Sequence, residues 1–148
     1  MKIIESRIEI NAPKDLVWQV LLDLDAYPLW NPFTPKVECS WKIGSDVVLH
    51  VDMKQNQKIQ IQKETLLWLK EGESLAWGIT SNFPVRTERA QILSALSDTK
   101  TNYYTYDKFW GLLVPLVIFL YGKNIQAGFD AIALGLKKRA EELYLNAH

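Results

Sequence analysis

The residues best suited to chemistry lie on two neighbouring segments that alternate like β-strands. In the first, "VRTERAQIL", Ala90 and Ile92 are the apolar residues of one face, and the period of two places Glu88 on that same inward face. In the second, "TNYYTYDKFW", large apolar residues occupy both alternating sets, so periodicity leaves the face of Asp107 open. An inward Glu88 would place an acid in an apolar interior.

Two carboxylates in one apolar cavity would repel each other and lose hydration, so at least one would keep its proton near neutral pH. Such a group could act as a general acid or base. The alternative is a structural network in which Arg86, Arg89 or an inward tyrosine satisfies the carboxylates. Lys63 and Thr65 fall on the inward face of their own strand if it is unbroken, and a bulge would turn both outward.

The sequence contains no other common catalytic motif. Cys39 is its one cysteine and there are two histidines, so neither an internal disulfide nor a zinc site is expected. We find no Ser-His-Asp constellation, no activated cysteine and no glycine-rich phosphate loop, and we expect no metal and no cofactor. Lys plus Arg equals Asp plus Glu at 17 each, which predicts no nucleic-acid partner.

The elements that must position these residues follow from periodicity. Residues 2–10 alternate as a half-buried strand, 13–23 repeat apolar residues at helical spacing, and Asp25 caps a second short helix. From 34 to 110 the period changes to two, and polar turns such as "KIGSD" and "SNFP" separate the strands of an antiparallel meander. Six strands are expected at residues 35–41, 46–54, 57–69, 74–81, 85–96 and 100–110. A helix of roughly 30 residues follows Gly111.

So long a helix in so small a protein needs a large surface to pack against. The expected fold is therefore α+β, a helix-grip in which a seven-stranded curved antiparallel sheet wraps around the long C-terminal helix. Two short helices lie between the first and second strands. The length of 148 residues fits a single domain, 1–148, which would bury roughly 68–70% of the surface that its unfolded chain exposes.

The stretch "DLDAYPLWNPFTPKV" sets Tyr27, Trp30 and Phe33 at three-residue spacing among three prolines. Because each proline lacks an amide donor and clashes with the preceding turn, a short helical turn and then a bend are expected. The three rings then belong either to the ordinary core or to the rim of a cavity. Asn31 is expected to cap a turn.

Two hydrophobic stretches bear on the membrane. The first residues, "MKIIESRIEI", alternate too regularly for a signal peptide, so a cytoplasmic location is expected. The run "GLLVPLVIFLY", residues 111–121, is far shorter than the roughly 20 residues that span a bilayer, and no stable membrane insertion is expected. We interpret it as a buried helix start; if it were exposed, it would mark a contact with a membrane or a protein.

Three stretches resemble the START-related and birch-pollen-allergen superfamily, often called SRPBCC, and within it the polyketide cyclase/dehydrase-like branch. "INAPKDLVWQVLLDLDAYPLWNPF" is similar to the superfamily's opening, and "SLAWG" to its "L.W" strand. "TYDKFWGLLVPLV" followed by "GFDAIALGLKKRAEE" is similar to the ending of that branch, with Asp107 where glutamate is usual and Ile132 where methionine is frequent. The match covers essentially the whole chain, and none of these motifs is catalytic.

The resemblance implies a deep cavity between the sheet and the long helix that holds hydrophobic small molecules. It also favours the inward face for Tyr103, Thr105 and Asp107, which would bring Asp107 near Glu88. With the strand and helix patterns, it gives these candidate ligand-binding residues: Trp30, Phe33, Val51, Met53, Ile61, Trp77, Glu88, Ala90, Tyr103, Thr105, Asp107, Leu116, Leu120 and Asn124.

The expected function is binding of a lipid-like or polycyclic molecule, for transport or sequestration. The alternative is a cyclase, dehydratase or isomerase that acts on a polyketide- or steroid-like substrate, with Glu88 and Asp107 as acid and base. Fold analogy does not choose between the two, and no oligomeric state is predicted. A third class, a membrane-docking or protein-interaction module, would require the run 111–121 to be exposed.

Overall fold

The computed structural model describes residues 1–81 and 84–147, and its elements follow one another in the order expected from the sequence. Asn82 and Phe83, which belong to the expected "SNFP" turn, and His148 lie outside the described residues. The elements are β1 (Lys2–Ile10), α1 (Lys14–Leu22), the 3₁₀ helix η1 (Leu24–Leu29), β2 (Lys36–Cys39), β3 (Asp46–Val51), β4 (Gln60–Lys70), β5 (Ser74–Gly78), β6 (Arg86–Ser97), β7 (Lys100–Trp110) and α2 (Val114–Ala147).

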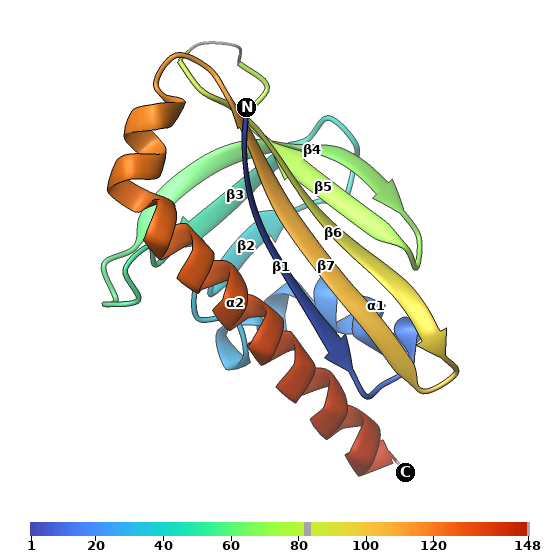
Figure 1. The fold of residues 1–148 in the computed structure, drawn as a ribbon. Coiled ribbons are helices and arrows are strands. Elements are labelled where there is room, and N and C mark those ends of the chain that lie inside the picture. The colour runs from blue at the N-terminus through green and yellow to red at the C-terminus, as the bar shows by residue number, and fades with distance from the viewer. Residues whose placement is uncertain (82–83, 148) are drawn as a thin grey trace.

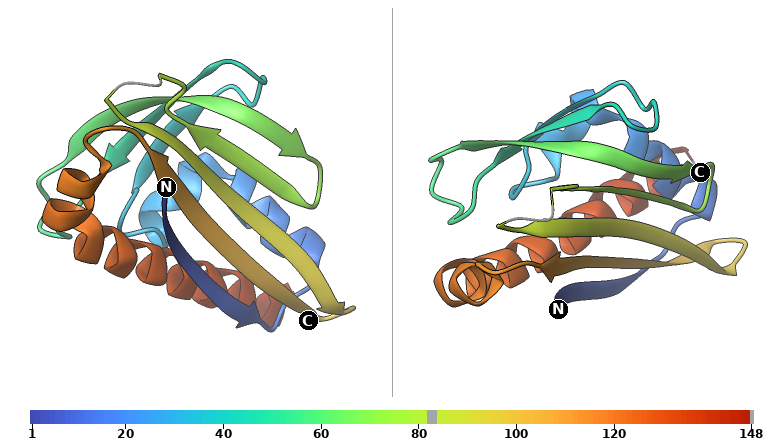
Figure 2. Two further views of the ribbon diagram at one scale, coloured as in Figure 1. Left: turned by 45° about the horizontal axis from the view of Figure 1, so that its top comes forward. Right: turned by 90° about the horizontal axis from the view of Figure 1, so that it is seen from above.

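The seven strands form one antiparallel sheet in the order β1-β7-β6-β5-β4-β3-β2. The sheet is curved, and α2 packs along β1 and against α1, so that the strands partly enclose the long helix (Figures 1 and 2). Every neighbouring pair except β1–β7 is joined by a short turn or loop, as in a meander. The prediction of an α+β helix-grip with two short helices after the first strand is confirmed.

One row of inward side chains crosses five strands of this sheet. Leu66 on β4 lies opposite Trp77 on β5, and Trp77 lies opposite Arg89 on β6. Arg89 in turn lies opposite Asp107 on β7, which pairs with Ile4 on β1. Residues directly opposite each other in antiparallel strands share a face of the sheet. The register therefore brings a guanidinium and a carboxyl group together on the concave face, between apolar neighbours.

The prediction that Glu88 and Ala90 face inward is wrong. The inward residues of β6 include Thr87 and Arg89, and Glu88 lies on the opposite face, where its Oε2 accepts a hydrogen bond of 2.7 Å from the Tyr106 hydroxyl. Ala90 is fully buried, but it lies opposite Tyr106 on that same outer face. Ala90 and Ile92 do not mark the inner face of β6, because polar side chains line the part of the concave side that faces the cavity.

Strand β4 shows the same reversal. Ile61, expected to face inward with Val51, is 68% exposed. In the observed register Ile61 lies opposite His50, and Val51 lies opposite Gln60. The polar glutamine therefore shares the inner face with Val51, and the isoleucine faces solvent.

Lys63 and Thr65 also lie on the outer face of β4. Lys63 is exposed, and its Nζ lies 3.3 Å from the Asp46 carboxylate at the surface. The β4–β5 register shifts between Leu66 and Trp68, beyond both residues, so this bulge does not set their direction. The same register that turns Ile61 outward excludes Lys63 from the interior.

The aromatic segment after α1 divides between core and cavity. Tyr27 and Trp30 are buried and pack edge to face with ring centroids 4.8 Å apart, so Trp30 is a core residue rather than a rim residue. Asn31 caps the following turn as expected, since its Oδ1 accepts a hydrogen bond of 2.8 Å from the Thr34 amide. Of the three rings, only that of Phe33 lines the cavity described below.

Two glycines allow α2 to contact this segment closely. A Cβ atom on Gly135 would lie 1.9 Å from the backbone oxygen of Trp30, and one on Gly128 would lie 2.2 Å from the Phe33 ring. No side chain larger than hydrogen fits at either position without movement of a neighbour. These contacts fix the distance between α2 and the segment that carries Phe33.

We expect Gly135→Ala to lower the free energy of unfolding by about 1–2 kcal/mol, because its Cβ meets a backbone atom that cannot rotate away. Urea denaturation followed by circular dichroism measures this. Gly122→Ala is the control on the same helix: its Cβ meets only the Ile118 side chain, at 3.2 Å, and the intrinsic preference of helices for alanine offsets that contact. Equal stability of the two variants would contradict the described packing.

Candidate functional site

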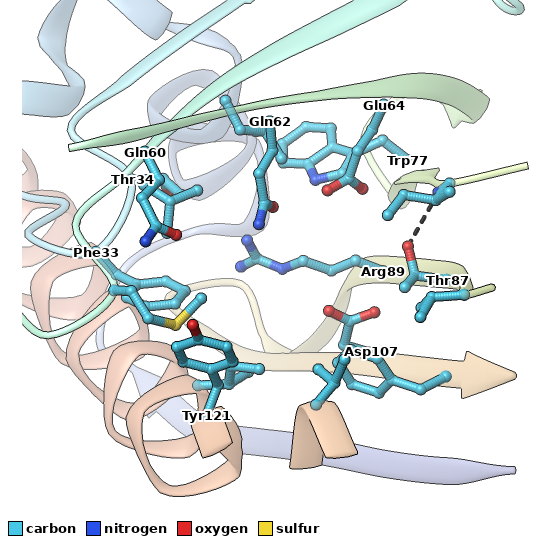
Figure 3. Close-up of a pocket in the computed structure, with 18 of the residues that line it drawn as sticks. Phe33, Thr34, Gln60, Gln62, Glu64, Trp77, Thr87, Arg89, Asp107 and Tyr121 are labelled. Carbon is cyan, nitrogen blue, oxygen red and sulfur yellow. Dashed lines mark hydrogen bonds between the residues drawn. The ribbon is translucent and has the colours of Figure 1, made fainter. Parts of the chain in front are cut away.

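A cavity of about 280 Å³ lies between the concave face of the sheet and the first half of α2 (Figure 3). Its walls are mainly apolar and aromatic. The strands, the segment before β2 and the loop after β3 contribute Phe33, Leu49, Val51, Met53, Trp77 and Phe109. Helix α2 contributes Val117, Tyr121, Ile125 and Phe129, which recur every four residues and so share one face.

Polar side chains from three strands, β4, β6 and β7, enter this apolar space. Figure 3 shows the side chain of Arg89 crossing the middle of the cavity, with Gln62 and Glu64 on one side of it and Asp107 on the other. Thr87 is already engaged, because its hydroxyl accepts a hydrogen bond of 2.9 Å from the Ile79 amide. The remaining groups surround Arg89 and define the polar part of the site.

Arg89 is a buried cation without a close ionic partner. Its side chain is 5% exposed, and its guanidinium carbon lies 4.4 Å from the centroid of Phe129 and 5.9 Å from that of Trp77. In the described part of the chain no ion pair joins it to a carboxylate, and its Nε and Nη2 have no hydrogen-bond partner. The ring faces offset part of the desolvation cost, and two donor nitrogens stay available.

The two carboxyl groups beside Arg89 are strongly perturbed. Burial raises the pKa of Asp107 well above its usual range, and the nearby Glu64 adds to this while Arg89 opposes it. Burial raises the pKa of Glu64 to about 7, again against the effect of Arg89. Burial therefore favours the protonated form of Asp107, and near neutral pH Glu64 is close to its midpoint.

This arrangement can recognise oxygen atoms and move protons. Besides Arg89, the indole Nε1 of Trp77 and the Oδ1 of Asp107 are buried without a partner among the described residues. Unsatisfied groups of this kind at an apolar cavity are the usual means of orienting a bound molecule. In residues 1–81 and 84–147 no group of three or more His, Cys, Asp or Glu side chains is arranged to hold a metal ion.

The structure brings together some of the predicted site residues. Phe33, Val51, Met53, Trp77 and Asp107 all line the cavity. The other predicted residues of the segment 23–37 and of β4 and β6 do not line it: Trp30, Ile61, Glu88 and Ala90.

Tyr103 and Thr105 share the inward face of β7 with Asp107, but neither lines the cavity. Both are fully buried, and their hydroxyls are engaged: Tyr103 donates to Gln91 Oε1 at 2.7 Å, and Thr105 donates to the Ala90 carbonyl at 2.8 Å. Their expected role in ligand contact is wrong for this structure, because they belong to the packed core beyond the cavity.

The predicted helix residues Leu116, Leu120 and Asn124 are also displaced from the site. Leu116 and Leu120 are exposed on the outer face of α2, and Asn124 does not line the cavity. The helix stripe that faces the sheet lies one position further along the chain and includes Val117 and Tyr121. The run "LLVPLVIFLY" is apolar all round, so hydrophobic spacing alone does not select the inward stripe.

The main residues that the sequence interpretation missed are Glu64 and the central role of Arg89. Arg89 was expected only as a partner for the carboxylates. A buried leucine on the same strand could have indicated the inward face of each residue. Leu66 on β4 follows Glu64 by two positions, and Leu93 on β6 follows Arg89 by four. Side chains separated by an even number of residues in a strand point to the same face, so each polar residue lies on the face of a buried leucine.

Fold and site together define a helix-grip protein with an internal, polar-centred cavity. The chain belongs to the family described as polyketide cyclase / dehydrase and lipid transport, whose sequence model matches residues 1–139. This confirms the SRPBCC resemblance. A search of curated protein sequences found no match.

Solved structures show the same fold. The Zhui aromatase/cyclase from Streptomyces sp. R1128 is 20% identical with a TM-score of 0.76, covering 95% of this chain and 94% of that one. A START superfamily protein from Mycobacterium smegmatis is 17% identical with a TM-score of 0.71, covering 95% and 98%. The protein XoxI from Bacillus cereus is 19% identical with a TM-score of 0.69 over the whole of both chains. At these identities the likeness concerns architecture.

The raised pKa of Glu64 has a consequence for stability. Folded Glu64 holds its proton up to about pH 7, whereas in the unfolded chain it loses the proton near the ordinary value of 4.5. Between these values the folded state binds more protons, so its stability falls as pH rises. Glu64→Gln removes this loss. The unfolding free energy of the variant minus that of the wild type should therefore increase by about 1–3 kcal/mol from about pH 5 to pH 8.

Urea unfolding at several pH values measures the difference. Glu88→Gln is the matched control, because Glu88 lies on the outer face and bonds a tyrosine hydroxyl instead of facing Arg89. If Glu64→Gln and wild type keep a constant difference across this pH range, Glu64 titrates normally and the described burial of its carboxyl is wrong.

Proposed function

We propose that the protein binds a compact polycyclic or aromatic molecule in the cavity beneath α2, with Arg89 as the anchor for an acidic or enolisable oxygen of that ligand. The family of the chain includes polyketide cyclases, dehydrases and lipid transport proteins, so a hydrophobic small molecule is in keeping with it. The observation that carries the proposal is the group of unsatisfied polar atoms at the centre of an apolar cavity.

The chemistry of these atoms indicates what they would bind. Arg89 Nε, Arg89 Nη2 and Trp77 Nε1 are donors, and Asp107 can donate as well in the protonated form that burial favours. A buried donor without a partner costs about 1–3 kcal/mol, which a ligand oxygen would recover. Three or four donors around one cation suit a carboxylate, phenolate or enolate oxygen better than a neutral hydrocarbon or an amine.

Size and wall composition set the rest of the ligand. The rings of Phe33, Phe109 and Phe129 offer flat apolar surfaces, and burial of apolar area contributes roughly 25 cal/mol per Å². A volume of about 280 Å³ is at the lower end of the ~300–1,000 Å³ usual for small-molecule pockets. Both features favour a few fused or linked rings over a two-chain phospholipid.

Two fluorescent probes with one aromatic framework test the anchor directly. 8-Anilinonaphthalene-1-sulfonate carries an anionic group, and N-phenyl-1-naphthylamine is its neutral counterpart. Arg89→Met should weaken binding of the anionic probe by about tenfold or more, since a charge-assisted hydrogen bond contributes roughly 1.5–3 kcal/mol, and should change binding of the neutral probe by less than about threefold.

Arg86→Met is the matched control, since Arg86 lies on the same strand but stacks over Trp110. It should leave both affinities unchanged. Equal losses for the two probes in Arg89→Met would mean that Arg89 serves packing alone, and no loss for either probe would reject the cavity as the binding site.

A second candidate function is proton-transfer catalysis on the same ligand class. The observation that favours it is the placement of Asp107, whose pKa burial raises, and of Glu64, whose pKa is about 7, on opposite sides of Arg89. Glu64 as carboxylate would remove a proton from carbon next to a ligand carbonyl, and Asp107 would give its proton to the carbonyl oxygen. Arg89 would stabilise the enolate as it forms. In this assignment Glu64 takes the place expected for Glu88.

Hydrogen–deuterium exchange of 2-tetralone in D₂O, followed by NMR, measures such enolisation. An enzyme should accelerate the exchange, and Asp107→Asn should lower the protein-dependent rate by about 10²-fold or more while probe affinity changes little. Glu88→Gln, on the outer face, should match the wild type. A wild type that binds the ketone without accelerating the exchange would rule out this reaction and leave binding as the function.

A further inference from the structure

The first turns of α2 and the turn just before them carry an apolar surface that the fold leaves uncovered. Leu112, Leu116, Phe119 and Leu120 are exposed, and Phe119 has 85% of its surface in contact with solvent. Residues 116, 119 and 120 recur at the spacing of one helix face, opposite the Val117–Tyr121 stripe that lines the cavity. We call these four residues the docking face. A contiguous patch of large apolar side chains on a monomer marks an interaction site.

Lysines lie on and near the turns of α2 that carry the docking face. The loop between β3 and β4 lies beside the first turns of α2 (Figures 1 and 2), and Lys54, Lys58 and Tyr121 line one shared hollow. Lys123 follows on the helix itself. Residues 53–63 and 108–129 contain no Asp or Glu. Asp52, at the base of the loop, is buried and accepts hydrogen bonds from the amides of residues 56 and 57.

From this combination we propose that the docking face binds the surface of a membrane containing anionic phospholipid. A helix with large apolar residues on one side and lysines at its border lies in the interfacial plane of such a bilayer. None of the helices in the described residues is both long and apolar enough to cross a membrane, so the contact is peripheral. The lysines would reach the phosphate groups while Phe119 enters the acyl region.

Charge argues against a second copy of this chain as the occupant. A two-fold symmetric contact through the docking face would bring the Lys123 side chains of both copies close to each other, with no Asp or Glu in residues 108–129 to offset them. An anionic bilayer instead attracts the lysines near the docking face.

The prediction that residues 111–121 form a buried helix start is wrong for the outer side of the helix, because the side chains there are exposed.

The position of this surface relates it to the cavity. Val117 and Tyr121 line the cavity from the same helical turns whose outer side carries the docking face. A membrane contact there would hold the ligand cavity beside a reservoir of poorly soluble molecules. Only this last consequence rests on the proposed function; the docking itself does not require that a ligand is bound.

Vesicle flotation of the full chain tests the proposal, with phosphatidylcholine vesicles compared with vesicles that also contain about 30% phosphatidylglycerol. The wild type should float with the anionic vesicles. Phe119→Glu should lower partitioning at least about tenfold, because it removes one buried aromatic ring. Leu145→Glu is the matched control: Leu145 is 74% exposed near the other end of the same helix, and its variant should float like the wild type.

The lysines are tested separately. Lys54→Gln/Lys58→Gln should reduce partitioning to anionic vesicles about five- to twentyfold and leave that to neutral vesicles unchanged. Lys42→Gln/Lys70→Gln has the same net charge but alters the far ends of β3 and β4, and it should have no effect.

Three results would overturn the proposal: no flotation of the wild type, equal flotation of Phe119→Glu and wild type, or a dimer in analytical ultracentrifugation that Phe119→Glu dissociates. The last result would assign the docking face to a second copy. Arg89→Met should float like the wild type, so a failure of cavity binding is distinguishable from a failure of docking.

Discussion

The burial of one positive charge, that of Arg89, governs the chemistry of this molecule. A guanidinium does not lose its proton in a protein, so its desolvation must be offset by its surroundings. The register of β5, β6 and β7 sets Trp77 and Asp107 on either side of it, and α2 adds the ring of Phe129 at 4.4 Å. The perturbed carboxyl groups and the polar lining of an otherwise apolar cavity all lie around this charge.

The architecture was predictable because it depends on patterns that extend over many residues. The change from helical spacing to a period of two after residue 34, and the polar turns that follow, predicted every strand of the sheet within a few residues of its ends. The inward face of a strand depends on only two or three side chains. On β4 and β6 these are polar, since they line the site, so Ile61 and Ala90 indicated the wrong face.

Helix α2 posed a different problem for prediction. Its existence and length follow from sequence, but its first turns are apolar on both sides, and only packing against the sheet selects Val117 and Tyr121 as the inner residues. The stripe is fixed further along, where Gly128 and Gly135 bring the helix against the Phe33 and Trp30 segment. The outer leucines and Phe119 are then left uncovered. The way in which α2 packs against the sheet therefore determines both the cavity wall and the docking face.

Both proposed functions, binding and proton transfer, depend on the absence of an ion pair between Arg89 and Asp107 in the described residues. A bidentate pair between Arg89 and Asp107 would satisfy both groups, hold Asp107 ionised and leave the guanidinium with few free donors. In the described residues no such pair forms, although the two are direct partners in the register. Burial and the nearby Glu64 therefore raise the pKa of Asp107 against the effect of Arg89, and Arg89 keeps Nε and Nη2 for a ligand. A carrier needs only the free donors, and an enzyme would also need a proton on Asp107, so both functions follow from the separation of one cation from one carboxyl group.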